Sequence, residues 1–350
     1  MGALWFWIVA LMLAAYVVLD GFDLGVGIVY LFVARSEQER QYALQAIGPV
    51  WDGNEVWLLA AGGTLFFSFP LVYASAFSGF YLPIMIVLWL FILRGVSIEL
   101  RSHSHEPLLR TFFDGLFAFS STMLVIFFGA ALANVVRGVP LGPDHYFFLP
   151  LWTDWRTGSH PGILDWYTVT GAALALIALA LHGSLYLALK TEGDLEKRAL
   201  SWARKLWPPV LGITLISIPA TVLARPNSLQ NYRTHPIALL APALVVAGIA
   251  VMFIAIRKGA NGIAFFGSCL YLASMLIGAA AGLFPALLPA VGEDGEDLTI
   301  ALALAGSHTL RVGLVWWSLG ILLALLYFCI VYWLFRGKVS QQASGCGHSA

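Results

Sequence analysis

The chain has 350 residues, of which 60% are hydrophobic and 11% charged, and its 19 basic and 19 acidic side chains balance at neutral pH. Its mean hydropathy is +0.83. Because these few polar side chains cannot cover the surface of a water-soluble globule, we expect a polytopic membrane protein surrounded by lipid. We expect no nucleic-acid partner.

Apolar runs recur along almost the whole chain, each bounded by charges or by Pro and Gly clusters. A helix needs about 20 apolar residues to cross the hydrocarbon layer, so the sequence predicts an all-α fold with about nine transmembrane helices. The expected spans are 4–33, 54–73, 76–97, 112–136, 163–189, 207–224, 236–256, 262–288 and 312–335. We expect residues 1–340 to form a single transmembrane domain and residues 341–350 to be a disordered cytoplasmic tail.

Lys and Arg are distributed unevenly between the two sides of these spans. With the N-terminus outside, fourteen of them, including Arg94 and Arg101, fall on the inner side and five on the outer side. The inner loops of membrane proteins carry the excess of positive charge. The pattern predicts an N-terminus outside the cell and a C-terminus in the cytoplasm.

Two acidic residues, Asp20 and Asp23, lie inside the first apolar run. A carboxylate near the centre of a bilayer costs at least ~2.5 kcal/mol, so protein or water must shield both. They are three residues apart on one helix face, beside Gly21 and Gly25, where another helix can approach closely. One interpretation is a relay for protons or cations. The other is a structural polar contact with a neighbouring helix, and the residues alone do not separate the two.

A second acidic pair, Asp52 and Glu55, leads into the second span. The spacing is that of an N-cap residue and the third residue of a helix, and Pro49 and Gly53 hinder an earlier helix from continuing. Carboxylates at a helix mouth can also collect protons and pass them inward. Capping and relay remain compatible interpretations.

A third charged group, Arg94, Glu99 and Arg101, lies near the inner end of the third span. We expect these side chains to form surface ion pairs. His182 and His308, the histidines closest to helices, are expected near opposite ends of their spans, so we predict no bis-histidine haem in this chain. The cysteines are not arranged like a metal site, and we predict no bound metal.

Two segments give the chain a family resemblance. Residues 19–27 read LDGFDLGVG and residues 47–58 read IGPVWDGNEVWL, and residues 61–101, with FSGFY at 77–81, continue the pattern. These segments closely resemble subunit II of the cytochrome bd-type quinol oxidases. The match is most specific over the first hundred or so residues and rests beyond them on helix count, hydropathy and length.

The resemblance implies nine helices in two four-helix bundles plus one peripheral helix, paired with a homologous subunit I in the bacterial inner membrane. Subunit I of the family carries haem b558, haem b595 and haem d, oxidises quinol and reduces dioxygen to water by four electrons. Subunit II supports assembly and proton access. Asp52 matches the family position where the proton path is entered, and Asp20 and Asp23 match its first-helix acidic pair. A structural quinone and small accessory subunits are further family features.

From these observations we expect subunit II of a bd-type quinol oxidase, with a proton path through Asp52, Glu55, Asp20 and Asp23 and no catalytic residue or cofactor of its own. The alternative is an ion-coupled secondary transporter, in which Asp20 and Asp23 bind the coupling ion beside a helix that is broken at the neighbouring glycines. The absence of a repeated acidic motif in the second half of the sequence counts against the transporter.

Overall fold

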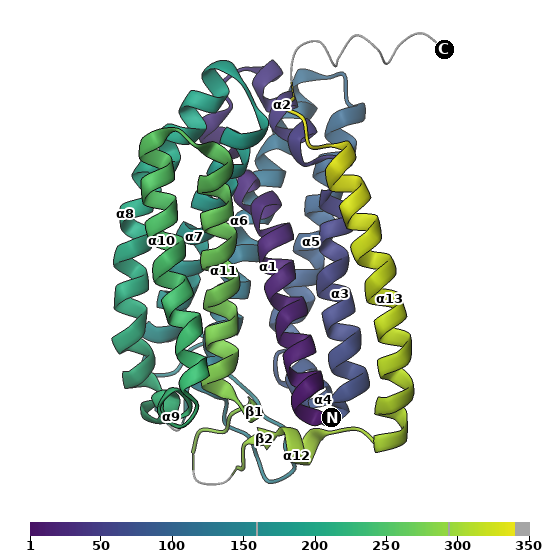
Figure 1. Cartoon of the computed structure of the whole chain (residues 1–350), viewed down its shortest axis with the longest axis vertical. Helices are drawn as coiled ribbons and strands as arrows, with labels where there is room; N and C mark the ends of the chain where they lie inside the picture. Colours follow the sequence, from purple (N-terminus) through teal and green to yellow (C-terminus); the bar gives the residue numbers. More distant parts are fainter. Residues whose placement is uncertain (159, 293–294, 340–350) are drawn as a thin grey trace.

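The computed structural model describes residues 1–158, 160–292 and 295–339, and within these ranges the protein is a bundle of long, roughly parallel and antiparallel helices (Figure 1). Eight of the described helices are long and apolar enough to cross a membrane. A ninth long helix, α3, runs alongside them. The prediction of an all-α membrane protein is confirmed. The expected tail at 341–350 lies outside the described residues.

Four of the long helices come from the first part of the chain and four from the middle, and one follows at the end. The first four are α1 (Gly2–Val33), α3 (Trp51–Ser68), α5 (Tyr81–His103) and α6 (Pro107–Arg137). The next four are α7 (Trp166–Lys190), α8 (Gly193–Ala224), α10 (Leu240–Lys258) and α11 (Asn261–Leu283). The last is α13 (Ser307–Leu334). Figure 1 shows α13 at the edge of the bundle, beside α3, as the expected peripheral helix.

Helix α1 lies at the centre and joins the two groups, because it packs against α3 and α6 of the first and α7 and α11 of the second. The α1–α7 contact depends on glycine. A Cβ atom on Gly25 would lie 2.0 Å from the carbonyl oxygen of Leu179 and 2.7 Å from the nitrogen of Gly183. The predicted close approach of another helix at Gly25 is therefore confirmed, and its partner is α7.

The expected second and third spans have different limits in the structure. Helix α3 ends at Ser68, and Pro70 begins the separate short helix α4 (Pro70–Gly79), which leads to α5. Proline has no backbone N–H and is tolerated in the first turn of a helix, which explains the break within the predicted 54–73 run. The expected span 207–224 lies within the longer helix α8, which begins at Gly193 and continues through Pro208 and Pro209.

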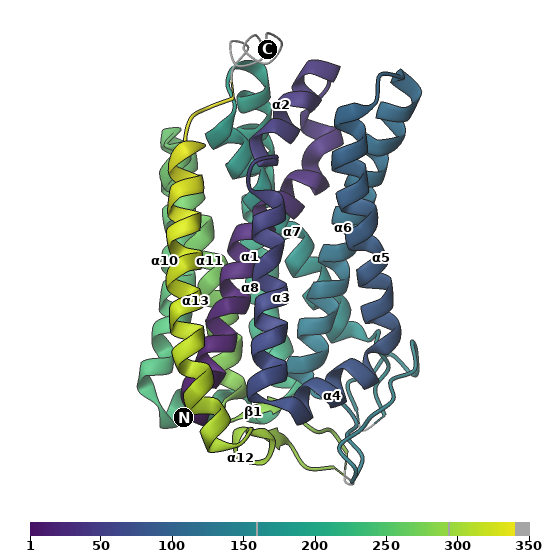
Figure 2. The same cartoon turned by 90° about the vertical axis from the view of Figure 1, so that its right-hand side faces the viewer.

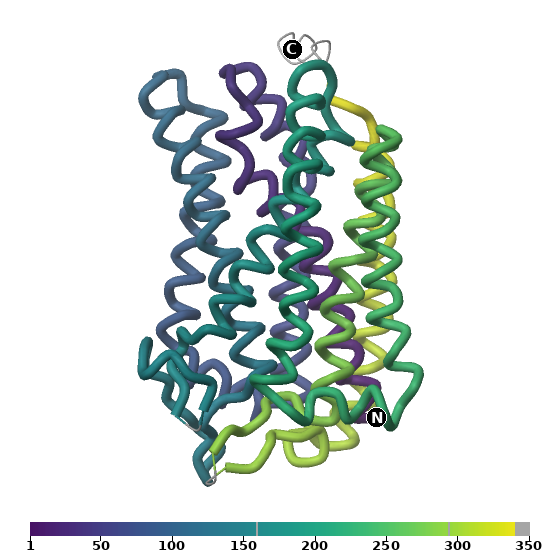
Figure 3. The backbone as a smooth tube through the Cα atoms, turned by 90° about the vertical axis from the view of Figure 1, so that its left-hand side faces the viewer, coloured from purple at the N-terminus to yellow at the C-terminus, as the bar shows by residue number. Residues whose placement is uncertain are grey.

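The two ends of the bundle differ. One end carries α2 (Glu37–Ile47), which follows α1 and precedes α3. The other end, where the N-terminus lies, carries the 138–165 connection and the segment around residues 284–306, which lie together in Figure 3. This segment contains the antiparallel strands β1 (Ala286–Leu288) and β2 (Leu298–Thr299) and the helix α12 (Ile300–Ala303). Three short helices, η1 (Pro226–Leu229), α9 (Gln230–Thr234) and η2 (Pro236–Leu239), connect α8 to α10.

Candidate functional site

A buried ion-pair cluster joins helices α1, α3 and α5. The guanidinium of Arg94 donates from Nη2 to Asp20 Oδ1 over 2.6 Å and from Nη1 to Asp20 Oδ2 over 3.1 Å. Nη1 also donates to Glu55 Oε1 over 2.8 Å. The side chains of Arg94 and Asp20 are completely buried, whereas that of Glu55 is 22% exposed. One buried cation is therefore shared by two carboxylates.

The position of Arg94 corrects the sequence analysis. Surface pairing with Glu99 was expected, but Arg94 points into the bundle and is fully buried. An arginine within an apolar helix must find an acidic partner inside the protein, because an unpaired charge there is very unfavourable. That rule, applied to Asp20 and Arg94 together, was the signal that the sequence offered. Arg101 also turns inward and pairs with Asp114 and Glu37.

Asp23 lies beside this cluster but has different partners. Its Oδ2 accepts a hydrogen bond of 2.7 Å from Asn54 Nδ2, and its Oδ1 has no hydrogen-bond partner among the described residues. Asn54 in turn accepts a hydrogen bond of 2.9 Å from the hydroxyl of Tyr332 on α13. Asp23 and Asn54 are completely buried. The two first-helix carboxylates thus lie on one face, as predicted, but each is held by a different neighbouring helix.

Asp52 is exposed on the surface of this chain. The structure corrects the capping interpretation, because α3 already begins at Trp51, its N-cap residue is Val50, and no side chain caps it. Asp52 lies in the first turn, where a carboxylate still interacts favourably with the helix dipole. It is one helical turn from Glu55. Side-chain exposure to solvent therefore decreases from Asp52 through Glu55 to Asp20.

A second buried acid, Asp114 on α6, was missed by the sequence analysis. Tyr30 donates its hydroxyl proton to Asp114 Oδ1 over 2.6 Å, Arg40 donates to Oδ2 over 3.0 Å, and Arg101 also donates to Oδ1. This network ties α1, α2, α5 and α6 together near the α2 end. The available signal was the position of Asp114 close to the start of an apolar run.

Arg137 and Asp165 form another buried pair, at the opposite end of the bundle. Both side chains are completely buried, and Arg137 also donates to the carbonyl oxygen of Gly162 over 3.1 Å and to Asn134 Oδ1 over 2.7 Å. Asp165 caps α7 through the backbone nitrogens of Tyr167 and Thr168. These contacts fasten the 138–165 connection to the ends of α6 and α7, which explains why Arg137 does not lie in an exposed loop.

His182 does not offer a nitrogen to haem iron. Its Nδ1 lies 2.7 Å from Ser268 Oγ and its Nε2 lies 3.0 Å from the carbonyl oxygen of Val18, so both ring nitrogens are engaged. The ring also stacks on Phe265. His308 lies at the start of α13, at the far end of the bundle. These two residues do not fit a shared haem.

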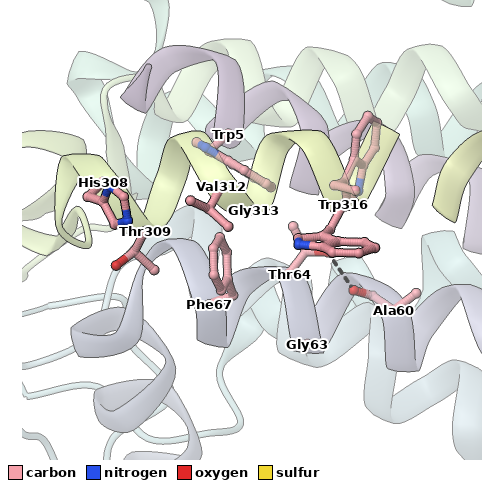
Figure 4. Close-up of a pocket in the computed structure, with 11 residues that line it drawn as sticks. Trp5, Ala60, Gly63, Thr64, Phe67, His308, Thr309, Val312, Gly313 and Trp316 are labelled. Carbon is pink, nitrogen blue, oxygen red and sulfur yellow. Dashed lines mark hydrogen bonds between the residues drawn. The ribbon is translucent and has the colours of Figure 1, made fainter. Parts of the chain in front are cut away.

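An apolar groove runs between α3 and α13 with α1 as its floor (Figure 4). Its wider part has a volume of about 570 Å³, and a smaller cavity of about 130 Å³ adjoins it at Ala60 and Trp317. Three tryptophans and one phenylalanine are among the lining residues, and His308 and Thr309 lie at the start of α13. The indole nitrogen of Trp5 has no hydrogen-bond partner among the described residues. The wider part is lined by Trp5, Ala60, Gly63, Thr64, Phe67, His308, Thr309, Val312, Gly313, Trp316 and Trp317.

Known proteins resemble this chain over nearly its whole length. The family model for cytochrome bd terminal oxidase subunit II matches residues 1–335. Cytochrome bd-I ubiquinol oxidase subunit 2 of Escherichia coli strain K12 is 29% identical over 367 aligned residues, which cover 97% of this chain and 95% of that protein. Cytochrome bd ubiquinol oxidase subunit 2 of Bacillus subtilis is 30% identical over 352 residues, with 97% of each chain covered.

The fold points the same way. A chain in the structure of bd oxidase from Geobacillus thermodenitrificans superimposes with a TM-score of 0.76 at 16% identity, covering 95% of this chain and 98% of that one. These matches decide between the oxidase and the ion-coupled transporter in favour of the oxidase. The chain belongs to the cytochrome bd terminal oxidase subunit II family, and it is a multi-pass subunit of a bacterial inner-membrane quinol oxidase whose haem-bearing partner is subunit I.

Proposed function

We propose that this subunit gives protons access to the haem-bearing subunit I through Asp52, Glu55, Asp20 and Asp23. One observation carries the proposal: the carboxylates run from the exposed Asp52 through Glu55, which is 22% exposed, to the completely buried Asp20. Arg94 joins the last two within hydrogen-bond distance. A proton entering at Asp52 thus meets a further acidic group one helical turn inward.

The charge balance of the cluster supports a role in proton transfer. Asp20, Asp23 and Glu55 supply three carboxylates, and Arg94 supplies one positive charge. Burying charge that no opposite charge compensates is very unfavourable. A cluster with this excess of acids can lower its energy by taking up a proton and can release it again when a neighbouring charge changes.

The experiment compares oxygen consumption by the assembled complex carrying Asp52→Asn with that of the unmodified complex, at equal haem content. We expect turnover to fall by about tenfold or more, since a positioned proton-transfer group typically contributes 10² to 10⁴. Glu99→Gln is the matched control, because Glu99 is an exposed carboxylate on α5 outside the cluster. Unchanged turnover in Asp52→Asn would reduce this chain to a purely structural subunit.

We also propose that subunit I packs against the exposed face of α3. Asp52, Val56, Leu59, Gly63 and Phe66 follow one another at helical spacing and are all exposed in this chain. A Cβ atom on Gly63 would meet nothing within 4 Å, so the face is open for a close neighbour. Crosslinking from Val56→Cys to subunit I tests this surface, and Ile218→Cys on the remote helix α8 is the control. Equal crosslinking from both positions would contradict the assignment.

The orientation and domain organisation remain proposals. We propose that the α2 end and the C-terminus face the cytoplasm and the N-terminus faces outside, on the basis of the Lys and Arg distribution. Reporter fusions at the two termini test this, and activity of an external reporter at the C-terminus would refute it. We retain residues 1–340 as one domain, because α1 packs against both helix groups. A protease-resistant fragment ending within the bundle would argue against it.

For the cofactors, we propose haem b558, haem b595 and haem d in subunit I and quinol as the electron donor. The engaged nitrogens of His182 support the placement of haem outside this chain. Haem retained by this subunit after separation from subunit I would overturn it. Small accessory subunits are a further proposal, tested by the polypeptides that co-purify.

The groove between α3 and α13 is our proposed site for a structural quinone. Its apolar lining, with Trp5, Phe67 and Trp316, suits an isoprenoid chain. The test is quinone content per complex after Gly313→Trp, which would fill the groove next to Phe67. Gly212→Trp on the remote helix α8, at a position with nothing within 4 Å of its Cβ, is the control. Unchanged quinone content in Gly313→Trp would exclude the groove.

A further inference from the structure

The side-chain amide of Asn54 is completely buried and makes hydrogen bonds at both of its ends. Nδ2 donates to Asp23 Oδ2 over 2.7 Å and to the carbonyl oxygen of Leu19 over 3.2 Å. Oδ1 accepts from the hydroxyl of Tyr332 over 2.9 Å. Because an amide has donors on one side only, these partners together fix which way Asn54 faces.

Tyr332 lies on α13 and contacts this amide from there. No residue in the most apolar stretch of α13 is buried within the described chain. Beyond Tyr332, the end of α13 is fastened to the second helix group. Lys190 on α7 donates to the carbonyl oxygen of Phe335, and Lys338 lies 2.9 Å from Glu196 on α8. Figure 1 shows the segment after α13 crossing toward these helices. The hydroxyl of Tyr332 is therefore carried by a helix that is anchored at its end.

We propose that Tyr332 and Asn54 are positioning residues that orient Asp23 for proton exchange. The inference rests on the proposed proton path and adds α13 to it. Tyr332 does not touch the reacting groups of subunit I; it acts through Asn54. Asn54 presents two N–H donors to α1, and one of them holds Asp23 Oδ2, so that the free Oδ1 has a fixed direction.

Removing the Tyr332 hydroxyl would release this arrangement. Asn54 Oδ1 would then be a buried acceptor without a donor, and the amide would no longer be held at that end. Its Nδ2 hydrogen bond to Asp23 would weaken as the amide moves, and such a bond favours the charged form of a carboxylate. Asp23 would hold its proton more firmly and would release it only at higher pH.

Other charged and titratable groups also lie near Asp23, and Tyr332→Phe leaves them in place. They are Asp20 on α1, Glu55 on α3, Arg94 on α5 and Tyr186 on α7. Because Tyr332→Phe changes only one hydroxyl, a shift in the pH dependence of Asp23 can be assigned to the loss of that hydrogen bond.

The experiment measures oxygen consumption against pH for the assembled complex carrying Tyr332→Phe, with haem content as the check on assembly. We expect the acidic limb of the profile to move upward by about half a pH unit to one unit, the effect of one hydrogen bond. Tyr327→Phe, on the exposed side of the same helix, is the matched control and should leave the profile unchanged. If the profile shifts in Asp23→Asn but not in Tyr332→Phe, the positioning role of Tyr332 is wrong and the proposed path through Asp23 still stands.

Infrared spectroscopy provides a readout that does not depend on turnover. The carboxyl band that disappears in Asp23→Asn should change frequency in Tyr332→Phe and in Asn54→Leu, but not in Tyr327→Phe. If turnover of Asp23→Asn equals that of the unmodified complex, the proposed path through Asp23 fails, while the band still tests the orientation by Tyr332. A band unaffected by Tyr332→Phe would refute the positioning role, and Asn54→Leu tests the same contact should Tyr332→Phe not assemble.

Discussion

Arg94 and Asp20, 74 residues apart in the sequence, form a two-pronged ion pair at the centre of the first helix group. Planar guanidinium and carboxylate groups match in this geometry, and the two parallel hydrogen bonds fix their relative orientation. The same guanidinium holds Glu55. One side chain thus joins the three helices α1, α3 and α5, whose ribbons are labelled in Figure 2.

Replacing Arg94 with Leu should strongly destabilise the subunit, because Asp20 would remain buried without a counter-charge. Breaking a buried ion pair by removing one partner typically costs about 3–5 kcal/mol. The measurement is the temperature at which the purified complex loses its haem absorption. Arg94→Lys keeps the charge but not the paired hydrogen bonds, so its loss should be smaller.

The double variant Arg94→Leu with Asp20→Leu separates pairing from packing. It removes both charges, so it should be more stable than Arg94→Leu alone. If the double variant is no more stable than the single one, the charge on Asp20 is not what destabilises the single variant.

Replacing Gly25 with Ala should force α1 and α7 apart. The new methyl group would lie 2.0 Å from the carbonyl oxygen of Leu179, a backbone atom that cannot rotate away. Overpacking of this kind typically costs about 1–3 kcal/mol or more. Thermal stability of the assembled complex is the measurement. Gly212→Ala on α8 is the control, because a Cβ atom there meets nothing within 4 Å, and stability should be unchanged or slightly higher. Equal stabilities of the two variants would contradict the close approach.

The sequence predicted the helices well because each helix that crosses a membrane needs a long apolar run, which the sequence shows directly. The Asp20 and Asp23 pair and the Gly25 contact could also be predicted, since an intramembrane acid and a glycine each imply a close neighbour. The identity of that neighbour could not. Arg94 was assigned to the surface because its partners lie far away in the sequence, and only the rule that intramembrane charges pair, applied to Asp20 and Arg94 together, could have linked them. Asn54 and Tyr332 were missed for the same reason.

The first and last residues of some helices were also difficult to predict, because hydropathy alone does not show where a helix begins or ends. The apolar run 54–73 continues through Phe69 and Pro70, but the missing N–H of Pro70 makes it the start of a new helix. In contrast, the apolar run near 207 gave no sign that α8 extends back to Gly193, because the first turns of α8 are rich in charged side chains. Helix length and membrane span are different quantities here.

Replacing Asp114 with Asn should loosen the α2 end of the bundle without removing a charge from the proposed proton path. Asp114 accepts from Tyr30, Arg40 and Arg101, so an amide at this position would turn a donor group toward at least one of them. Loss of a partner in such a network typically costs about 3–5 kcal/mol. Faster proteolysis near α2 is the expected result, measured against Asp194→Asn, whose carboxylate is 76% exposed. Equal proteolysis rates would show that α2 is held by other contacts.

The strength with which α2 is held against the bundle should also depend on pH through Glu39, which lies outside the membrane spans. Partial burial raises the pKa of Glu39, but hydrogen bonds from the backbone nitrogens of Arg35 and Ser36 and from the Arg198 guanidinium outweigh it, so the pKa lies below its ordinary value of 4.5. A carboxylate whose pKa is lowered by folding stabilises the folded state above its ordinary pKa, and this contribution is lost as the pH falls through the lowered value.

Glu39→Gln should therefore melt at a lower temperature than the unmodified protein at pH values above about 4.5, and the difference should shrink as the medium becomes more acidic than that. Glutamine can still accept the hydrogen bonds from the backbone at Ser36, but it has no charge to pair with Arg198. Asp194→Asn is the matched control, since its exposed pair with Lys197 should contribute little at any pH. Melting temperatures of Glu39→Gln that run parallel to those of the unmodified protein at all pH values would show that the charge of Glu39 does not hold α2 against α8.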